Sequence, residues 1–239
     1  MASRKFCPKW WAVLVTCFGL IILSSLGFWQ LRRADEKTKL LDSYAQLQHQ
    51  APLELSKVTK NQEILAYQPL KVGGVYVNDQ QFILDNRYYQ HQFGYEIITP
   101  LLLANGKILL VNRGWVKAAA NRDILPEIKE QALQQQLKGT VYYPSAKVIV
   151  YGNSLETKVG WPKRIEKVDF SMIQKLLGRN LYPFVLRLDK SAPDGFVRDW
   201  HVVILKPSRH LGYAFQWFMM AVAVLLIFII VNVKREDNE

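Results

Sequence analysis

The run WWAVLVTCFGLIILSSLGFWQL, from Trp10 to Leu31, decides the fold together with a second apolar run from Leu211 to Val233. Neither run contains Lys, Arg, Asp or Glu. Each is long enough to cross the hydrocarbon core of a bilayer, which takes about 20 helical residues. The two runs predict a membrane hairpin, with one transmembrane helix over residues 10–31 and a second over residues 210–233.

Short basic tails flank the predicted helices. Basic residues close to a membrane span stay in the cytoplasm, whereas long domains cross the membrane largely regardless of charge. The tails, residues 1–9 and 234–239, hold these basic residues: Arg4, Lys5, Lys9, Lys234 and Arg235. We therefore expect both tails inside, and residues 32–209 as one domain in the periplasm or the intermembrane space.

The first run also has features of a signal peptide, because a basic start precedes an apolar stretch. An uncleaved anchor is favoured, because Phe28, Trp29 and Gln30 follow where a small-residue cleavage site would be needed. Cys17 lies deep within the run, which argues against a lipoprotein cleavage box.

The chain is strongly basic. It has 239 residues with 31 Lys and Arg against 20 Asp and Glu, a formal net charge of +11, and 50% of its residues are hydrophobic. A field of that sign suits anionic lipid headgroups, acidic protein surfaces or carboxylate-bearing ligands. Proximity to the membrane argues against nucleic acid as a partner. A solvated surface with surplus lysine is the alternative explanation.

The cysteines and histidines restrict the chemistry. Cys7 and Cys17 are the only cysteines, so the outer domain has none for a disulfide, a zinc site or a thiol nucleophile. His49, His91 and His201 are scattered rather than placed at metal-ligand spacing. The sequence shows neither a Gly-rich phosphate loop nor a serine nucleophile motif. It therefore favours a protein that is not an enzyme.

Between the spans the sequence predicts an α+β domain. Apolar positions recur at helical spacing from Ala34 to His49, which indicates an amphipathic helix that continues out of the membrane. β-branched and aromatic residues predict strands over residues 70–77, 81–86, 94–103, 107–116, 182–188 and 200–205. Further expected elements are helices over 123–137 and 170–177, strands bent at Pro144 over 139–150, and a loop over 152–163. We expect one mainly antiparallel sheet or open barrel.

Asn105 and Gly106 mark the clearest hairpin, because Asn-Gly readily adopts the positive φ angles of a tight turn. A meander follows if the strand ending at Arg87, the strand 94–103 and the strand ending at Arg113 are consecutive neighbours. The first and third strands then run the same way. This arrangement would deliver Arg87 and Arg113 to one end of the sheet.

The second span opens with a stripe of chemically distinctive residues. On a helix, His210, Tyr213, Ala214 and Trp217 fall at i, i+3, i+4 and i+7, on one face. That stripe could seat a planar macrocycle, with His210 as the axial ligand of its iron. The alternative is an interfacial belt, because Trp and Tyr gather at headgroup depth.

In a hairpin, the end of the first span lies at the depth of His210. Gly27 would permit close helix approach there, and Trp29 and Arg33 share a face at i, i+4. Arg33 or Arg209 could pair with carboxylates. Snorkelling of arginine to the membrane interface is the alternative explanation.

Three motifs stand in order along the chain. They are Leu26-Gly27-Phe28-Trp29-Gln30 followed by Arg33, then Val111-Asn112-Arg113-Gly114-Trp115-Val116, then His210 with Tyr213 and Trp217. Together they resemble the Surfeit locus protein 1 family of cytochrome c oxidase assembly factors, over nearly the whole chain. The resemblance implies a non-enzymatic factor of the bacterial or mitochondrial inner membrane. It would hold haem a or help insert it into subunit I of the oxidase.

The resemblance also implies site residues and partners. Bacterial members of the family bind haem through the histidine that opens the second span, which is His210 here. The other positions that match motifs of the cofactor site are Trp29, Gln30, Arg33, Tyr213 and Trp217, and an outer-domain signature without an assigned role covers Asn112, Arg113, Gly114 and Trp115. The expected partners are subunit I and the haem a synthase. The alternative function is a membrane-anchored scaffold or sensor whose outer domain binds a protein without haem.

Overall fold

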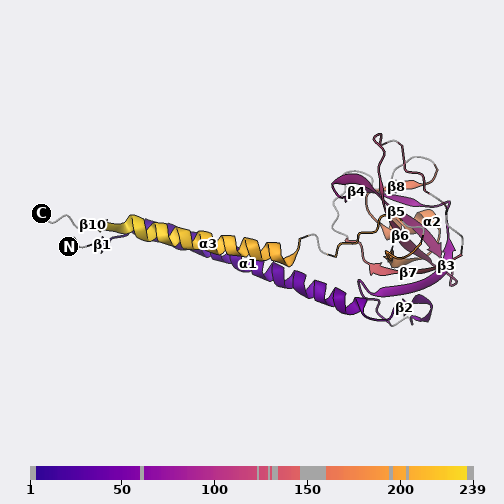
Figure 1. Ribbon diagram of the computed structural model, residues 1–239, viewed down its shortest axis with the longest axis horizontal. Coiled ribbons are helices and arrows are strands. Elements are labelled where there is room, and N and C mark those ends of the chain that lie inside the picture. The colour runs from indigo at the N-terminus through magenta and orange to yellow at the C-terminus, as the bar shows by residue number, and fades with distance from the viewer. Residues whose placement is uncertain are drawn as a thin grey trace. The chain divides into compact units, whose positions relative to one another are not determined.

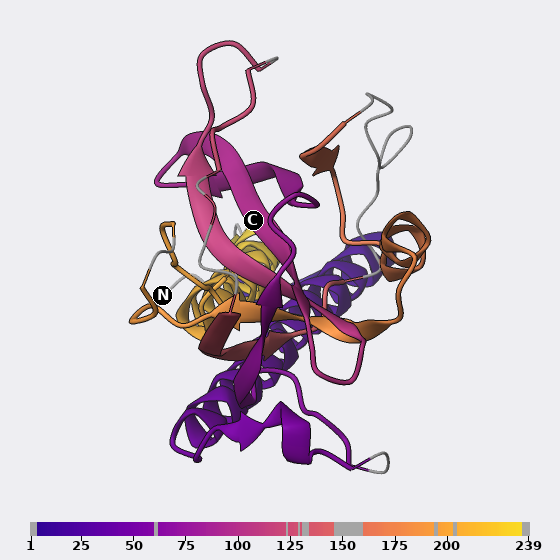
Figure 2. The ribbon, with the colours of Figure 1, turned by 90° about the vertical axis from the view of Figure 1, so that its right-hand side faces the viewer.

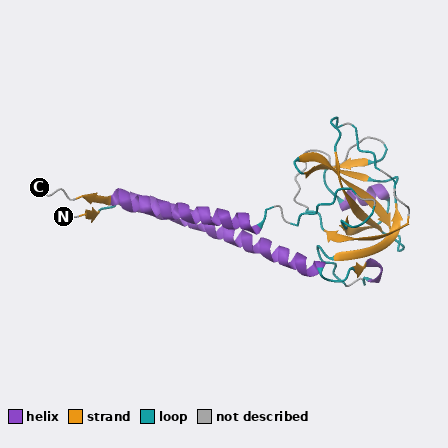
Figure 3. Cartoon of the chain, viewed as in Figure 1, coloured by secondary structure: helices purple, strands orange, loops and turns teal. Residues whose placement is uncertain are grey.

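A computed structural model describes residues 4–59, 62–122, 124–128, 130, 134–145, 160–193, 196–202 and 205–235. The chain forms two compact units. One unit, here called the helical unit, comprises residues up to Ser43 and from His201 onward, and the other, the β domain, comprises Tyr44–Trp200. Figures 1 and 3 show the elements of each unit.

Two long helices dominate the helical unit. Helix α1 spans Trp10–Gln48 and helix α3 spans Pro207–Asn232. Both are long and apolar enough to cross a membrane, with mean hydropathies of 2.1 and 2.6 over their most apolar windows. The 39 residues of α1 extend for about 58 Å, well beyond a hydrocarbon core of about 30 Å. The prediction that the first span continues as a helix toward His49 is confirmed.

The two helices lie side by side and run antiparallel (Figure 1). Phe28 packs edge-to-face on Phe218 with ring centroids 5.3 Å apart, and Phe6 packs likewise on Phe228 at 5.8 Å. Beyond the helices, the short strands β1 (Arg4–Phe6) and β10 (Val233–Arg235) pair antiparallel. The described tails therefore meet at one end of the pair, as a hairpin requires.

Most large apolar side chains of the helical unit are exposed along both helices. Burial is confined to the narrow stripe where the helices touch, formed by Gly27, Gln30, Ala34, His210, Ala214 and Ala221. Small residues let two backbones approach closely, and an apolar surface of this extent is suited to lipid.

The β domain is built on a sheet of eight described strands. In chain order its elements are β2 (Leu53–Glu54), a 3-10 turn η1 (Leu55–Lys57), β3 (Pro69–Tyr76), β4 (Phe82–Tyr89), β5 (Gln92–Leu102), β6 (Ile108–Lys117), β7 (Gln134–Tyr142), β8 (Lys163–Ile165), helix α2 (Phe170–Leu177) and β9 (Leu181–Leu188). The spatial order is β2-β3-β7-β9-β6-β5-β4-β8, with an additional pairing of β3 with β5.

The extra pairing closes five strands into a ring, here called the barrel: β3, β7, β9, β6 and β5 (Figure 2). Its ladders are antiparallel except for the parallel pair β6 and β9. Strands β4 and β8 extend the sheet beyond β5. The structure confirms the predicted fold class, α+β with a mainly antiparallel sheet or open barrel between two apolar helices.

Side chains alternate between two cores along these strands, as the pleat dictates. On β6, Leu109 and Val111 belong to the core enclosed by the barrel, whereas Ile108 and Leu110 belong to a second core outside it. Helix α2 contributes Ile173 to the outer core. From Ile108 to Asn112 the parity of the residue number therefore gives the face of the sheet, and a register shift before Gly114 ends this alternation.

Local signals placed several elements correctly. Helix α2 coincides with the predicted 170–177, because Asp169 caps its start by accepting from the Met172 N–H and Gly178 ends it at φ 63°. The Asn105-Gly106 hairpin is confirmed, with Gly106 at φ 78° and its N–H bonded to the Leu103 carbonyl. The meander of β4, β5 and β6 is also confirmed.

Other predictions were wrong. The helix predicted over 123–137 is contradicted, because residues 124–128 are not helical and β7 begins at Gln134. Pro126 is incompatible with a helix interior, and Gln134–Leu137 completes the ladder with β3. The strand predicted over 200–205 is absent from its described residues, where Trp200 is instead attached to the end of β9 through a hydrogen bond from its indole N–H to the Leu188 carbonyl. Parts of the predicted segments 139–150 and 152–163 lie outside the described residues.

Candidate functional site

His210 and Gln30 meet where the two long helices touch. Helix α3 starts at Pro207, whose fixed φ suits the first helical position, so His210 lies in the first turn. Its Nδ1 atom is 2.8 Å from Oε1 of Gln30 on α1. Both residues are only 9% exposed. The structure thus joins two of the predicted site residues that are 180 positions apart in the chain.

This contact sets the chemistry of the imidazole. With Gln30 Oε1 as the acceptor, a neutral His210 imidazole carries its proton on Nδ1 and keeps the lone pair on Nε2. A second hydrogen-bonding partner on the far nitrogen is the usual device that orients a histidine ligand and raises its basicity. His210 is therefore prepared as a single nitrogen donor.

Small residues make the contact possible. Gly27 lies one turn before Gln30, and a methyl group there would come within 2.7 Å of the Phe218 ring. Ala34 and Ala214, one turn beyond Gln30 and His210, are buried. The expectation that Gly27 permits close helix approach agrees with this packing.

The aromatic residues predicted for the site do not join this contact. Tyr213 is 43% exposed and Trp29 45% exposed, while Trp217 is half-buried. The stripe predicted as one face of α3 is therefore divided: His210 and Ala214 face α1, and Tyr213 points outward. Tyr213 and Trp29 are therefore exposed aromatic side chains within one turn of His210 and Gln30 along their own helices.

The arginines near this site are on the surface. Arg33 donates to the Glu36 carboxylate at 2.8 Å, one turn along α1, and both side chains are about half exposed. Exposed pairs of this kind contribute little stability, at most about 1 kcal/mol. Arg209 is also exposed. Arg33 can therefore exchange Glu36 for another carboxylate at small cost.

A haem fits this donor set better than a metal ion held by protein ligands alone. Among the described residues, no group of three or more His, Cys, Asp or Glu could hold a metal ion. A haem iron takes four donors from its own macrocycle and needs only an axial ligand from the protein. The lone pair on His210 Nε2 meets that requirement, and the exposed rings of Tyr213 and Trp29 are apolar surface for a macrocycle.

The outer-domain motif at Asn112 to Trp115 has a structural role. Arg113, on the barrel side of β6, is 1% exposed and donates to Gln81 Oε1 at 3.2 Å and Thr99 Oγ1 at 3.4 Å. Its guanidinium also lies 5.2 Å from the centre of the Phe196 ring and 6.0 Å from that of Tyr76. Arg113 therefore links three strands and the 196–198 segment inside the domain.

Gly114 and Trp115 hold that segment against β6. Gly114 has φ 127°, and a methyl group there would come within 2.8 Å of the Val197 carbonyl oxygen. The Trp115 N–H donates to the same oxygen at 2.7 Å, and its indole N–H donates to the Arg87 carbonyl at 3.2 Å. Only glycine combines this φ with this close approach.

The strand directions predicted for the two arginines are correct, but the arginines lie on different faces of the sheet. Arg113 points to the barrel side. Arg87 lines an outer cavity together with Asn112. The alternation of side chains along β6 explains this separation, because Asn112 and Arg113 are adjacent in the strand.

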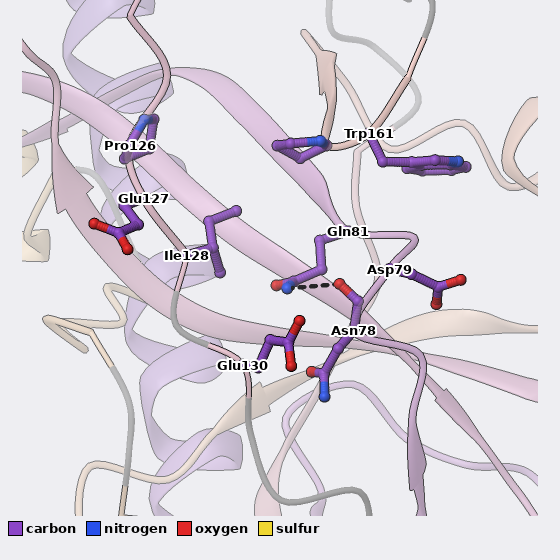
Figure 4. A pocket seen from close by; sticks show the side chains of 9 residues that line it. Asn78, Asp79, Gln81, Pro126, Glu127, Ile128, Glu130 and Trp161 are labelled. Atoms are coloured by element: carbon purple, nitrogen blue, oxygen red, sulfur yellow. Dashed lines mark hydrogen bonds between the residues drawn. The ribbon is translucent and has the colours of Figure 1, made fainter.

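A second cavity, of about 280 Å³, opens near Gln81 (Figure 4). Its lining includes the carboxylates Asp79, Glu127 and Glu130, so its charge is opposite to that of the chain. Gln81 donates to the Asn78 carbonyl at 2.9 Å and accepts from Arg113. The buried Arg113 is thereby hydrogen-bonded to Gln81, a residue that lines this cavity.

Comparisons with known proteins agree on one family. The model of the SURF1 family matches residues 17–222. A SURF1-like protein of Rickettsia bellii is 30% identical over 228 residues, covering 90% of this chain and 87% of the relative. One of Rickettsia prowazekii is 29% identical, covering 91% and 87%. Surfeit locus protein 1 of Arabidopsis thaliana is 31% identical over 127 residues, covering 48% and 36%. The match spans both long helices and the β domain between them, and the chain therefore belongs to the SURF1 family.

Proposed function

We propose that this protein is a membrane-bound assembly factor of cytochrome c oxidase that holds haem a, or helps insert it, at subunit I. Membership of the SURF1 family supports the assembly role. The hydrogen bond between His210 and Gln30 carries the haem-holding role, because it leaves a lone pair on Nε2 of an oriented imidazole.

Each residue of the site has a part in this function. His210 would hold a bound haem a, which would supply an iron that takes a nitrogen ligand. Gln30 keeps the proton on Nδ1 of His210, so that Nε2 is the donor atom. Tyr213, Trp217 and Trp29 offer ring surface beside the imidazole. Arg33 releases Glu36 to pair with a propionate carboxylate, by a charge-assisted hydrogen bond.

Delivery is then a competition between two sites. The carrier offers one protein ligand next to largely exposed rings. A client site with better ligation and deeper burial binds the cofactor more tightly and removes it. The function needs no catalytic group, which agrees with the proposal that this protein is not an enzyme.

We place the protein in the bacterial or mitochondrial inner membrane, with residues 10–31 and 210–233 as spans. The basic tails stay inside, and the β domain lies in the periplasm or the intermembrane space. There the positive charge of the chain favours docking on acidic surfaces of subunit I or of the haem a synthase.

The test is replacement of the ligand. Full-length protein co-expressed with haem a synthesis is purified in detergent, and its haem absorbance and haem-to-protein ratio are measured. We expect His210→Ala to lose the bound haem, whereas His49→Ala, at an exposed histidine, keeps it. Gln30→Leu should weaken binding by about 10- to 100-fold, because the second partner of the imidazole is lost.

Two results contradict the proposal. An unchanged spectrum and ratio in His210→Ala would remove His210 from the site. A colourless wild-type protein, purified from cells that make haem a, would instead favour a scaffold that binds a protein partner without haem. Circular dichroism of each variant checks that the helices are intact.

A further inference from the structure

A small cavity lies on the outer face of the barrel, lined by residues of the β domain. Its volume is about 80 Å³. Five neighbouring strands each contribute a polar side chain to its lining: Arg87 from β4, Glu96 from β5, Asn112 from β6, Arg187 from β9 and Tyr142 from β7. The cavity thus includes the first residue of the Asn112 to Trp115 motif, to which the proposed haem site assigns no role.

Strand register brings these side chains to one face. Asn112 pairs directly with Arg187 in the parallel ladder, and Ile98 pairs with Asn112 on the other side. Residues directly opposite each other in neighbouring strands project to the same face of a sheet. Asn112, Arg187 and Ile98 therefore form a row across three strands. The row is fixed by backbone pairing rather than by flexible loops.

The guanidinium of Arg187 lies near two aromatic rings. Its central carbon is 3.5 Å from the centre of the Tyr142 ring and 5.1 Å from that of Trp200. Stacking occupies the faces of a guanidinium and leaves its edge for hydrogen bonds. The Nε atom of Arg187 is buried and has no hydrogen-bond partner among the described residues. Burial, together with the positive charge of Arg87, lowers the pKa of Arg187.

Arg87 also lines the cavity and resembles Arg187 in the burial of its Nε atom. Its Nε is also buried without a hydrogen-bond partner among the described residues. Glu96 Oε1 lies 4.0 Å away, too far for a hydrogen bond, and Glu96 Oε2 accepts from Asn112 Nδ2 at 2.6 Å. Glu96 is therefore committed to Asn112. Because Lys167 also lines the cavity, the described lining residues include three cationic side chains and one carboxylate.

Besides Pro144 and Ser145, the lining includes four aliphatic side chains, and the space is limited. Leu84, Ile98, Val168 and Val185 line the cavity beside the charged groups. A volume of 80 Å³ holds only a few heavy atoms, since a water molecule in the liquid takes about 30 Å³. A ligand for this site must be small, carry negative charge at one end and have an apolar stem at the other.

We propose that this cavity binds a carboxylate on a short aliphatic stem, with Arg87 and Arg187 donating to its two oxygens. The planar carboxylate matches the edges of two guanidinium groups. A phosphate matches the charge but offers nothing to the four aliphatic side chains. A short-chain carboxylic acid and the carboxyl terminus of a peptide both present this chemistry. The proposal does not depend on the haem site, which lies in the helical unit.

The test follows the Nε–H signals of the two arginines by ¹⁵N NMR in the full-length protein in detergent. Sodium propionate is titrated at constant ionic strength, with propionamide and sodium chloride in parallel. We expect saturable shifts of the Arg87 and Arg187 signals with propionate and none with propionamide or chloride. Equal, unsaturated shifts with all three would overturn the proposal.

Variants assign the binding to the cavity. Arg187→Lys keeps the charge and most of the stem but loses the planar fork, so we expect the propionate Kd to rise about tenfold or more, read from the Arg87 signal. Arg179→Lys, at an exposed arginine outside the cavity, should leave the Kd unchanged. An unchanged Kd in Arg187→Lys would contradict the assignment. Val185→Thr tests the aliphatic side of the cavity, and it should weaken the binding of propionate more than the binding of formate.

The source of the carboxylate is distinguished in a final comparison. An acetylated dialanine with a free carboxyl terminus is titrated beside its amide and beside propionate. Tighter binding of the peptide acid than of propionate identifies a peptide carboxyl terminus as the ligand. Tighter binding of propionate identifies a free short-chain acid. Absence of binding by both acids overturns the proposal.

Discussion

The ring of Phe218 rests on the backbone of Gly27: a methyl group at Gly27 would lie 2.7 Å from both Cε1 and Cζ of that ring. The same ring packs edge-to-face on Phe28. Gly27 is one helical turn from Gln30, the partner of His210. The spacing of the helices at the candidate site is therefore fixed by the absence of a side chain at one position.

Gly27→Ala should loosen the helical unit. Either Phe218 leaves its place on Phe28 or the helices separate, and overpacking of this kind costs about 1–3 kcal/mol. Unfolding is measured by titration with SDS and monitored through tryptophan fluorescence. Gly19→Ala is the matched control on α1, because no heavy atom lies within 4 Å of the added methyl group. Equal midpoints for both variants would contradict the proposed contact.

Gly114→Ala should destabilise the β domain by about 3 kcal/mol. The substitution places alanine at φ 127° and drives its methyl group against the Val197 carbonyl, so strain and overlap add. Gly106→Ala is the control, since its φ is also positive but nothing lies within 4 Å, and about 1 kcal/mol is expected there. Thermal melts by circular dichroism measure both. The explanation fails if Gly106→Ala costs as much as Gly114→Ala.

Arg113→Leu should cost about 3 kcal/mol or more of folding free energy. The change removes the Arg113 donor from Gln81 Oε1, which then accepts from Thr99 Oγ1, and from Thr99 Oγ1 itself, and it removes the cation beside Tyr76 and Phe196. Chemical denaturation of the full-length protein gives the value. Arg179→Leu, on the surface, should stay within about 0.5 kcal/mol of the wild type. A free energy of unfolding close to that of the wild type in Arg113→Leu would show that the contacts of this arginine do not stabilise the β domain.

Tyr76 should make the β domain sensitive to alkaline pH. Burial raises the pKa of Tyr76 to about 12, although Arg113 and Arg198 oppose the shift, whereas an unfolded tyrosine titrates near 10. Between pH 10 and 12 the unfolded chain loses this proton and the folded chain keeps it. The free energy of unfolding therefore falls with rising pH in this window, by up to about 3 kcal/mol, and is unaffected by this group below pH 10.

Tyr76→Phe isolates that contribution. At neutral pH the free energies of unfolding of wild type and variant should differ by a constant amount. From pH 10 upward the wild type should lose stability relative to the variant. Melting temperatures over pH 8 to 12 provide the measurement. Parallel curves for the two proteins over the whole range would rule out the raised pKa as the cause.

Local signals made much of the fold predictable. The spans follow from length and lack of charge, and α2 follows from Asp169 and Gly178 at its ends. Closure of the barrel was not predictable, because the contact of β3 with β5 and the parallel pair of β6 and β9 depend on distant segments. Pro126 was a local signal against the helix predicted over 123–137.

The candidate site was predictable in part. Topology placed both span ends together, and the family motifs included His210 and Gln30, but their contact depends on the relative rotation of two helices. The spacing of Gly27, Gln30 and Ala34 along one face of α1 was the available signal, because small residues at such intervals mark a helix interface. Prediction of the row formed by Asn112 and Arg187 required the order of the strands in the sheet, and the alternation of side chains along a single strand does not reveal that order.

The antiparallel helices and the ladder of β1 with β10 have a consequence for the chain between them. Residues 44–200 connect the two helices. While the helices and the β1–β10 ladder stay paired, the unfolded β domain is therefore a closed loop, not a chain with two free ends. Closing a loop removes conformational entropy from the denatured ensemble, as a covalent cross-link does. The helix pair thus acts as a reversible cross-link, which stabilises the native β domain by lowering the entropy of its unfolded state.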